Sequence, residues 1–133
     1  MAKYVLFSPV SGKVVAAGKP MAGVTVKRWY KGGYSSKEAT DTTQTDPSGQ
    51  FSFPVATFSS LMAGIVPHEP VVTQRMFVVV DGQDVQVYGM VKHNYELNGE
   101  FGGQPLNFVF DTKADIRQVG SDLTPISIRS PKP

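Results

Sequence analysis

The stretch from residue 10 to residue 54 constrains the fold more than any other part of this chain. Short apolar runs alternate there with clusters of turn-forming residues, in the order strand, turn, strand, polar excursion, tight turn and strand. Val24 and Val26 alternate with polar residues, and so do Phe51 and Phe53. A period of two is typical of strands that bury one face and expose the other. The stretch therefore predicts three β-strands that share one apolar layer.

Both turns of this stretch have recognisable chemistry. The first runs from Gly18 to Gly23, where a proline presets φ and the glycines accept positive φ. In the second, the Asp46 carboxylate can cap backbone N–H groups, Pro47 fixes the first corner and Gly49 takes the left-handed position. Because these signals are local, we expect both turns at these positions.

The rest of the chain carries similar punctuation. Its 133 residues include 13 Gly and 10 Pro, which disfavours long helices and favours short strands joined by turns. Asp81-Gly82 and Asn98-Gly99 each predict a β-hairpin. Apolar residues between positions 58 and 65 have near-helical spacing, so we expect a short helical turn there, packed as a satellite contact of the core.

These patterns predict a single all-β domain over residues 1–120, built as a Greek-key β-sandwich of seven to nine strands. Residues 121–133 are polar and rich in proline, with one apolar pair, Ile126 and Ile128. We expect a strand-like arm or a loose tail at this end.

Three motifs carry a family resemblance: Gly12-Lys-Val-Val, Gly18-Lys-Pro-Met-Ala-Gly-Val-Thr-Val and Thr45-Asp-Pro-Ser-Gly-Gln-Phe-Ser-Phe-Pro. Over residues 8–54, about a third of the chain, the sequence resembles carboxypeptidase regulatory-like domains. Those domains belong to the transthyretin-like group of seven-stranded β-sandwiches. The resemblance implies a transthyretin-like or immunoglobulin-like sandwich that serves as an accessory, ligand-binding or partner-binding module, usually without catalysis of its own.

The sequence argues against an enzyme. The enzymatic relatives in that group, the 5-hydroxyisourate hydrolases, need an N-terminal His and a C-terminal Tyr-Arg-Gly-Ser. This chain has no His before His68, and its last residues read Ser127-Ile-Arg-Ser-Pro-Lys-Pro. His68 and His93 lack a close ligand pair, and neither a nucleophile elbow nor a phosphate-binding loop occurs. We expect no catalytic residue, metal or other cofactor.

Charge, cysteine content and hydropathy exclude further classes. The net charge of +2 is too small to indicate nucleic acid, although residues 1–66 hold seven basic against three acidic residues. Without cysteine there are no disulfides and no thiolate metal sites. No apolar run matches a secretory signal or approaches the roughly 20 residues of a membrane span. We expect a cytoplasmic protein with neither a nucleic-acid nor a membrane partner.

Aromatic and basic residues collect in and around the polar excursion after the second strand. They are Trp29, Tyr30 and Tyr34 with Lys27, Arg28, Lys31 and Lys37. Trp, Tyr and Arg contribute much of the binding energy at protein interfaces. The predicted partner-binding surface comprises Trp29, Tyr30, Lys31 and Tyr34, with Arg75, His93 and Tyr95 as outside candidates. The alternatives are that the aromatic residues cover one end of the sandwich and that the charges form a solvated loop.

The leading functional hypothesis is a non-enzymatic protein-binding module. By analogy, a small bacterial protein of this kind resembles a partner of secreted toxins, so we expect a toxin immunity protein or an adaptor of a secretion system, with a secreted toxin or effector as partner. One alternative is a carbohydrate-binding accessory domain that uses Trp29 and Tyr34 as stacking platforms. A transthyretin-like hydrolase is the weakest alternative.

Overall fold

The computed structural model describes residues 3–33 and 37–131, except for the side chain of Lys37. These residues form twelve strands, one short α-helix and one 3-10 helix. In chain order they are β1 (Lys3–Phe7), β2 (Val10–Ala16), β3 (Lys19–Pro20), β4 (Thr25–Gly32), β5 (Lys37–Gln44), β6 (Gln50–Phe53), β7 (Ala56–Ser59), α1 (Leu61–Ile65), β8 (Val72–Val80), β9 (Gln83–Lys92), η1 (Gly99–Phe101), β10 (Leu106–Asp111), β11 (Ile116–Gly120) and β12 (Pro125–Arg129).

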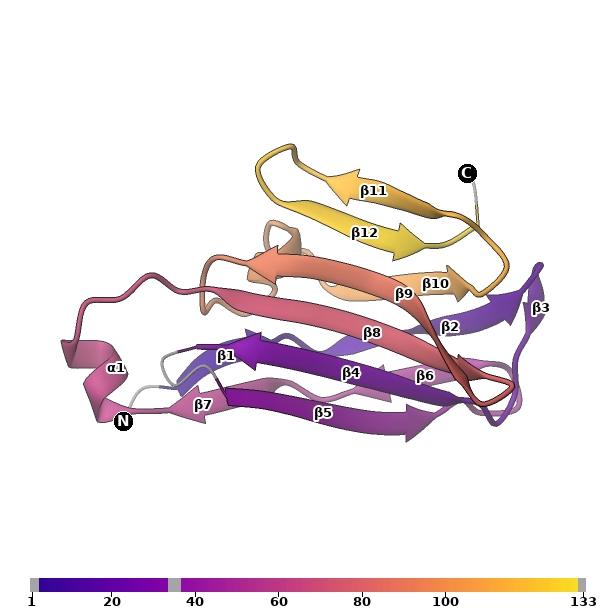
Figure 1. Cartoon of the computed structure of the whole chain (residues 1–133), viewed down its shortest axis with the longest axis horizontal. Coiled ribbons are helices and arrows are strands. Elements are labelled where there is room, and N and C mark those ends of the chain that lie inside the picture. Colours follow the sequence, from indigo (N-terminus) through magenta and orange to yellow (C-terminus); the bar gives the residue numbers. More distant parts are fainter. Residues whose placement is uncertain (1–2, 34–36, 132–133) are drawn as a thin grey trace.

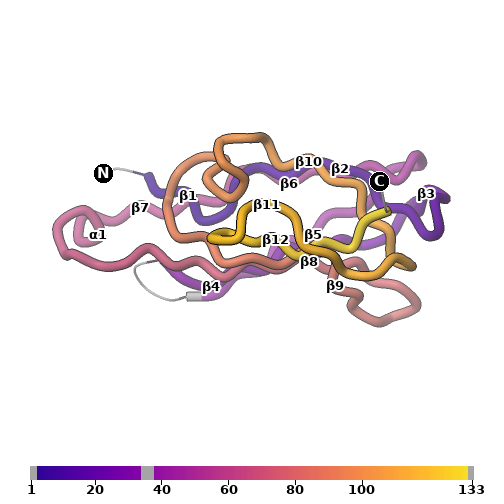
Figure 2. Tube along the Cα trace, turned by 90° about the horizontal axis from the view of Figure 1, so that it is seen from above, coloured from indigo at the N-terminus to yellow at the C-terminus, as the bar shows by residue number. Residues whose placement is uncertain are grey.

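Two layers of strands face each other (Figure 1 and Figure 2). The larger layer is a six-stranded sheet in the order β11-β12-β9-β8-β4-β5. The opposite layer holds a four-stranded sheet, in which β2 pairs with β10, β3 and β6, and a two-stranded sheet of β1 and β7. This arrangement confirms the predicted all-β sandwich.

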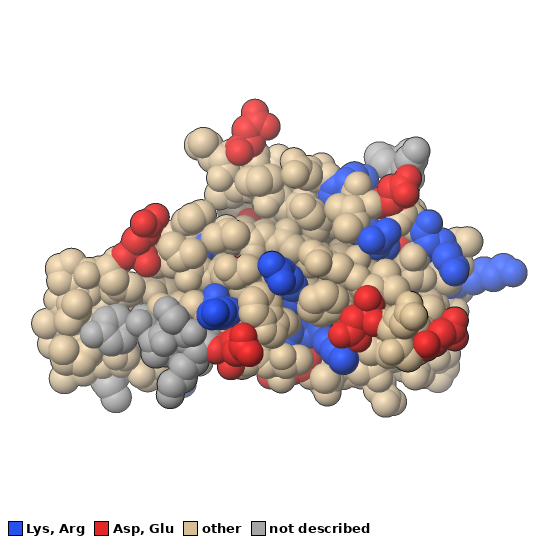
Figure 3. Space-filling model, in the orientation of Figure 1, with Lys and Arg blue, Asp and Glu red and all other residues tan. Residues whose placement is uncertain are grey.

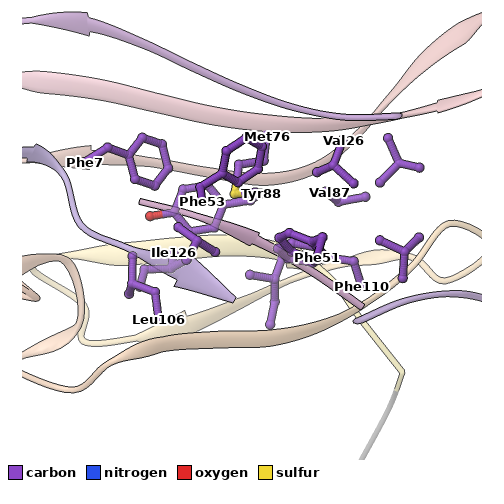
Figure 4. Close-up of a cluster of buried hydrophobic side chains, with 14 of the residues drawn as sticks. Phe7, Val26, Phe51, Phe53, Met76, Val87, Tyr88, Leu106, Phe110 and Ile126 are labelled. Atoms are coloured by element: carbon purple, nitrogen blue, oxygen red, sulfur yellow. The ribbon is translucent and has the colours of Figure 1, made fainter. Parts of the chain in front are cut away.

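A mixed aromatic and aliphatic core fills the space between the layers (Figure 4). The predicted alternation is confirmed, because Phe51, Phe53 and Val26 are buried on inward faces. The Phe51 and Phe110 rings stack with centroids 5.9 Å apart and so connect β6 and β10, two of the strands that pair with β2. The labelled core residues are Phe7, Val26, Phe51, Phe53, Met76, Val87, Tyr88, Leu106, Phe110 and Ile126.

The two predicted turns lie against each other. In the second turn, Asp46 Oδ1 accepts hydrogen bonds from the backbone N–H groups of Ser48 and Gln50, each at 2.9 Å. The Thr45 hydroxyl donates to the Met21 carbonyl oxygen at 2.6 Å and so ties this turn to the first one. The predicted capping role of Asp46 is confirmed.

Of the two predicted hairpins, one is confirmed and the other is wrong. Asp81 and Gly82 both have positive φ and connect β8 to β9 in a two-residue turn, as a type I′ hairpin requires. Asn98 instead precedes the 3-10 helix η1. Long-range contacts decide this, because the Asn98 N–H donates to the Ser8 hydroxyl and Glu100 is buried.

More strands form than the seven to nine expected. A two-residue strand, β3, lies inside the first turn and pairs with β2. At the other end of the chain, β12 pairs with both β11 and β9, and the Ile126 side chain is fully buried. Residues 125–129 are therefore an integral strand of the sandwich and not a loose tail.

The predicted helical turn forms as α1, and its N-cap is the Ser60 hydroxyl, which accepts from the Ala63 N–H. The expected satellite packing is wrong for most of its apolar side chains. Leu61 and Ile65 are exposed, because α1 projects from the end of the sandwich (Figure 1). No helix in the described part of the chain is long and apolar enough to cross a membrane.

Candidate functional site

Strand β4 presents one face to the interior and the other to solvent. Val26 and Arg28 are buried, whereas Trp29 is half-buried on the opposite face. Because side chains alternate along a strand, Lys31 shares the outer face with Trp29, and it is exposed. Since β4 lies between β5 and β8, both side chains stand on the outer surface of the six-stranded sheet.

Trp29 and Arg75 form a stacked pair on this surface. They are direct cross-strand neighbours in the β4–β8 ladder, and the Arg75 guanidinium carbon lies 5.2 Å from the centroid of the indole ring. A cation–π contact of this kind contributes about 0.5–1 kcal/mol at an exposed site. It orders two large side chains side by side before any ligand arrives, so the face presents a preformed platform.

A shallow groove of about 320 Å³ adjoins the pair. Gly89 is the next residue across the sheet from Arg75, and because it has no side chain the Gln86 amide can lie against it at the floor of the groove. Ser127 on β12 is the neighbour of Gly89 on the other side. The groove is also lined by Thr73, Gln86, Met90, Val91, His93, Leu123 and Pro125.

The charges of this face are mixed. Lys27 pairs with Asp84 at 3.1 Å, but Lys31 and Arg75 form no ion pair with any described residue. Figure 3 views this side of the molecule and shows basic and acidic side chains interspersed over the sheet, without a continuous patch of one sign. An aromatic side chain flanked by two cations that lack an acidic partner among the described residues is typical of a protein-binding hot spot.

The structure contradicts the predicted surface cluster of cations at Arg28. This side chain is 1% exposed and lies between the layers. Its guanidinium pairs with Asp41 at 2.6 Å, donates to the Pro54 carbonyl oxygen at 2.7 Å and lies 4.8 Å from the centre of the Phe53 ring. A buried charge requires such partners, and Arg28 finds them on elements that are distant in sequence.

Tyr30 also lies on the inward face of β4, so it does not share a surface with Trp29. Its ring meets the Phe7 ring edge-on at 6.1 Å between centroids. Burial, and then the charge of Asp41, raise the pKa of Tyr30. The polar excursion expected after the second strand is in part a strand itself, since β4 continues to Gly32.

Tyr95 belongs to a separate aromatic cluster near α1. Its ring contacts the rings of Tyr4 and Phe58, with centroids 5.2 and 5.3 Å away. Its hydroxyl is hydrogen-bonded to His68 Nε2 at 2.8 Å, and burial raises its pKa. Tyr95 is therefore packed against β1 and β7, apart from the Trp29–Arg75 pair.

The structure thus brings together three of the seven predicted site residues, at the Trp29–Arg75 stack and the groove beside it. Trp29 contacts Arg75, and Arg75 and His93 line the same groove. Lys31 shares their face, whereas Tyr30 and Tyr95 lie elsewhere. Tyr34 lies outside the described residues.

Sequence reasoning missed Gly89, Gln86, Ser127 and Leu123. Leu123 is 91% exposed at the rim of the groove. The sequence predicts which residues alternate within each strand. It does not predict the register that places Gly89 beside Arg75, because register depends on pairing between strands. The Gly within the apolar run of β9 was the one available signal, since a strand glycine often marks a close approach or an open site.

The two histidines lie in different parts of the molecule. His68 contacts Tyr95, whereas His93 lines the groove on the outer face. Within residues 3–33 and 37–131, no group of three or more His, Asp or Glu side chains could hold a metal ion. The arrangement of the outer face suits recognition by stacking, charge and hydrogen bonding.

Comparison with known proteins gives one match. Residues 10–114 match a family model described as a domain of unknown function (DUF6795). The searches of curated proteins and of solved structures found no significant match.

Proposed function

For a chain that belongs to this family of domains of unknown function, we propose a non-enzymatic protein-binding role, carried by the outer face of the six-stranded sheet. The observation that supports it is the Trp29–Arg75 stack beside an open groove. Tryptophan and arginine are the residues most enriched where interface energy concentrates. Lys31 adds a second cation without an ion-pair partner among the described residues.

The same stack favours a protein partner over a sugar. A sugar ring stacks on an open aromatic face, but the Arg75 guanidinium already covers one face of the indole. The positive charges of Arg75 and Lys31 instead suit a carboxylate or a carbonyl group of a protein partner. The exposed Leu123 at the groove rim supplies an apolar contact for the same partner.

The partner that we propose is a secreted toxin or effector, for which this chain acts as an immunity protein or an adaptor in the bacterial cytoplasm. The likeness of residues 8–54 to carboxypeptidase regulatory-like modules supports this choice, since those modules serve as accessory domains. Neighbouring genes that encode a toxin or a secretion component are the expected context.

The test is affinity capture from extracts of the native host, followed by calorimetry with the purified partner. We expect Arg75→Glu and Trp29→Ala each to weaken binding at least tenfold, which is about 1.4 kcal/mol. The matched control is Lys19→Glu, a charge reversal at an exposed position of the opposite layer. If the control weakens binding as much as Arg75→Glu does, or if neither site variant has an effect, the outer face is not the interface.

A carbohydrate ligand remains the second candidate, because Gln86, His93 and Ser127 give the groove several hydrogen-bonding groups. A glycan array with the wild-type protein tests it directly. Sugar binding that quenches or shifts Trp29 fluorescence and disappears in Trp29→Ala would favour this candidate over a protein partner.

A further inference from the structure

Strand β5 is one end of the six-stranded sheet, and its outer edge is open. It pairs with β4 in a regular ladder of eight residue pairs, and no strand among the described residues pairs with its other side. Such an edge presents a row of unpaired backbone N–H and C=O groups. Proline, lysine and bulges are common means of blocking an edge strand. β5 has neither proline nor a bulge, and its one lysine, Lys37, is its first residue, so residues 38–44 lack all three.

A groove of about 590 Å³ runs beside this edge. One wall is formed by residues 40–43 of β5, and the other by residues 52–57, where β6 ends and β7 begins. Arg28 and Tyr30 lie at the groove from β4, and Val55, 42% exposed, adds apolar surface. The groove separates the two layers on the open side of the sandwich, because β5 belongs to one layer and β6 to the other.

The groove has an acidic acceptor that is only half used. Asp41 Oδ2 accepts hydrogen bonds from Arg28 Nε at 3.2 Å and from its terminal nitrogen at 2.6 Å, whereas Oδ1 accepts none from the described residues. The Asp41 side chain is 40% exposed. Arg28 is the one basic residue among the described residues that line the groove, and its charge is already paired. An incoming basic side chain therefore finds an acceptor in Asp41 Oδ1, whereas an acidic side chain finds no unpaired basic partner among the described residues that line the groove.

A second copy of this chain fits the edge poorly. Antiparallel pairing of two β5 edges about the middle of residues 38–44 would set Asp41 opposite the Asp41 of the other copy. Like charges directly opposite each other destabilise a strand pair. The charge pattern thus favours a segment of a different protein.

We propose that the β5 edge is a second interface, separate from the outer face, which takes up an extended segment of a partner protein as an added strand. The segment carries apolar side chains at every second position, which enter the groove beside Val55 and Tyr30. A lysine or arginine at one of these positions pairs with Asp41. Backbone hydrogen bonds to β5 supply affinity, and the groove supplies selectivity.

The test begins with a phage library of random decapeptides, selected on the immobilised full-length protein. We expect the enriched peptides to alternate apolar residues and to share a lysine or arginine. A synthetic consensus peptide should slow hydrogen–deuterium exchange of residues 38–44. Val55→Asp should weaken its binding at least tenfold, while Val109→Asp, at a valine of similar exposure on β10, should leave binding within twofold.

A second measurement tests the ion pair between the basic residue of the peptide and Asp41. Replacing the basic residue of the peptide by glutamine should weaken binding to the wild type at least fivefold but should have little effect with Asp41→Asn. Three results would overturn the proposal: no enrichment above background, protection of the Trp29 face in place of residues 38–44, or protection of residues 38–44 without peptide that grows with protein concentration. The last result would identify a second copy as the occupant.

Discussion

Lys92 and Glu100 hold opposite charges in the interior, with Nζ and Oε1 3.3 Å apart and both side chains fully buried. Glu100 also accepts hydrogen bonds from the Ser8 N–H and hydroxyl, at 2.8 and 2.6 Å, and from Gln74 Nε2 at 3.0 Å. Lys92 donates to the Glu96 carbonyl oxygen at 2.6 Å. Burial lowers the pKa of Lys92, and the nearby Glu100 carboxylate opposes that shift. This network anchors the segment after β9 to β1 and β8.

Breaking this pair on one side should be costly. Glu100→Gln leaves the Lys92 charge buried without a counter-charge, and we expect a loss of about 3–5 kcal/mol in the free energy of unfolding, measured by urea denaturation. Lys27→Met is the control, because it removes an exposed ion pair with Asp84 and should cost no more than about 1 kcal/mol. Equal losses of unfolding free energy in the two variants would show that the buried pair contributes no more to stability than the exposed one.

Acid should destabilise the protein partly through Asp111. Burial alone raises the pKa of this carboxyl, but hydrogen bonds from the Lys113 and Ala17 N–H groups outweigh burial and hold the pKa below its usual value. The folded state therefore binds fewer protons than the unfolded chain as the pH falls through about 4, and the stability present at higher pH is lost. In Asp111→Asn, the decline of the urea midpoint between about pH 5 and 2 should be shallower. Asp122→Asn, at an exposed carboxylate, is the control and should retain the wild-type slope.

At the scale of the element, close approach of two strands makes one glycine more demanding than another. Gly12 of β2 is paired with Phe108 of the parallel strand β10, and a Cβ atom at Gly12 would overlap the Phe108 carbonyl oxygen. Gly82, at the β8–β9 turn, has φ of +77°, but a Cβ atom added there would meet no other atom within 4 Å. The first glycine is required by space and the second by backbone conformation.

These two causes predict different costs. Gly12→Ala must push two paired backbones apart, and we expect a loss of about 2–3 kcal/mol in unfolding free energy. Gly82→Ala meets only the left-handed backbone penalty, about 1 kcal/mol. Thermal or urea unfolding of both variants tests the ranking. A larger loss at Gly82 would mean that β2 and β10 adjust to an added methyl group.

Local chemistry explains which elements were predictable from the sequence. The Asp46 turn and the Asp81-Gly82 hairpin depend on residues within a few positions of each other, and both formed where expected. Alternation along β4 places Arg28 on the same face as Val26, yet its charge favoured an exposed position. Its burial depends on Asp41 and on the Pro54 carbonyl, which only the folded structure brings together.

The residues of the candidate site were predictable in part, but their arrangement was not. Trp29 was part of the predicted partner-binding surface, and Arg75 and His93 were outside candidates for it. Alternation with Val24 and Val26 also places Trp29 on the opposite face of its strand. Their common location required the register of three strands, with Trp29 opposite Arg75 and Arg75 opposite Gly89. Register depends on pairing across the sheet, so neither the stack nor the groove could be derived from the sequence.

At the scale of the whole molecule, the C-terminal strand completes the core. β12 lies beyond residue 114, where the family match ends, yet it lies within the six-stranded sheet, between β11 and β9. Ile126 is fully buried and Ile128 is 5% exposed. The folded unit therefore includes at least one strand beyond the matched residues.

Truncation of one side chain should reveal this contribution. Ile126→Ala leaves a cavity between the layers, and we expect a loss of about 2–5 kcal/mol in unfolding free energy. Ile116→Ala, at an isoleucine of β11 that is 47% exposed, is the matched control and should change stability by no more than about 0.5 kcal/mol. Similar small changes in both variants would indicate that β12 is dispensable.

The pairing of β2 with β10 and the hydrogen bonds from Ser8 to Glu100 also delay folding during synthesis, because both join early and late parts of the chain. Ser8 precedes its carboxylate partner by 92 residues. At about 5–20 residues per second, a ribosome needs roughly 5–18 s to make that span. β6 (Gln50–Phe53) is made within this interval, but β10 (Leu106–Asp111) follows it, so β2 lacks one of its pairing partners throughout and apolar surface stays open to other chains. The two-layered fold of the nascent protein is therefore completed late, after β10 and β12 have been made, and chaperone contact is most useful before that point.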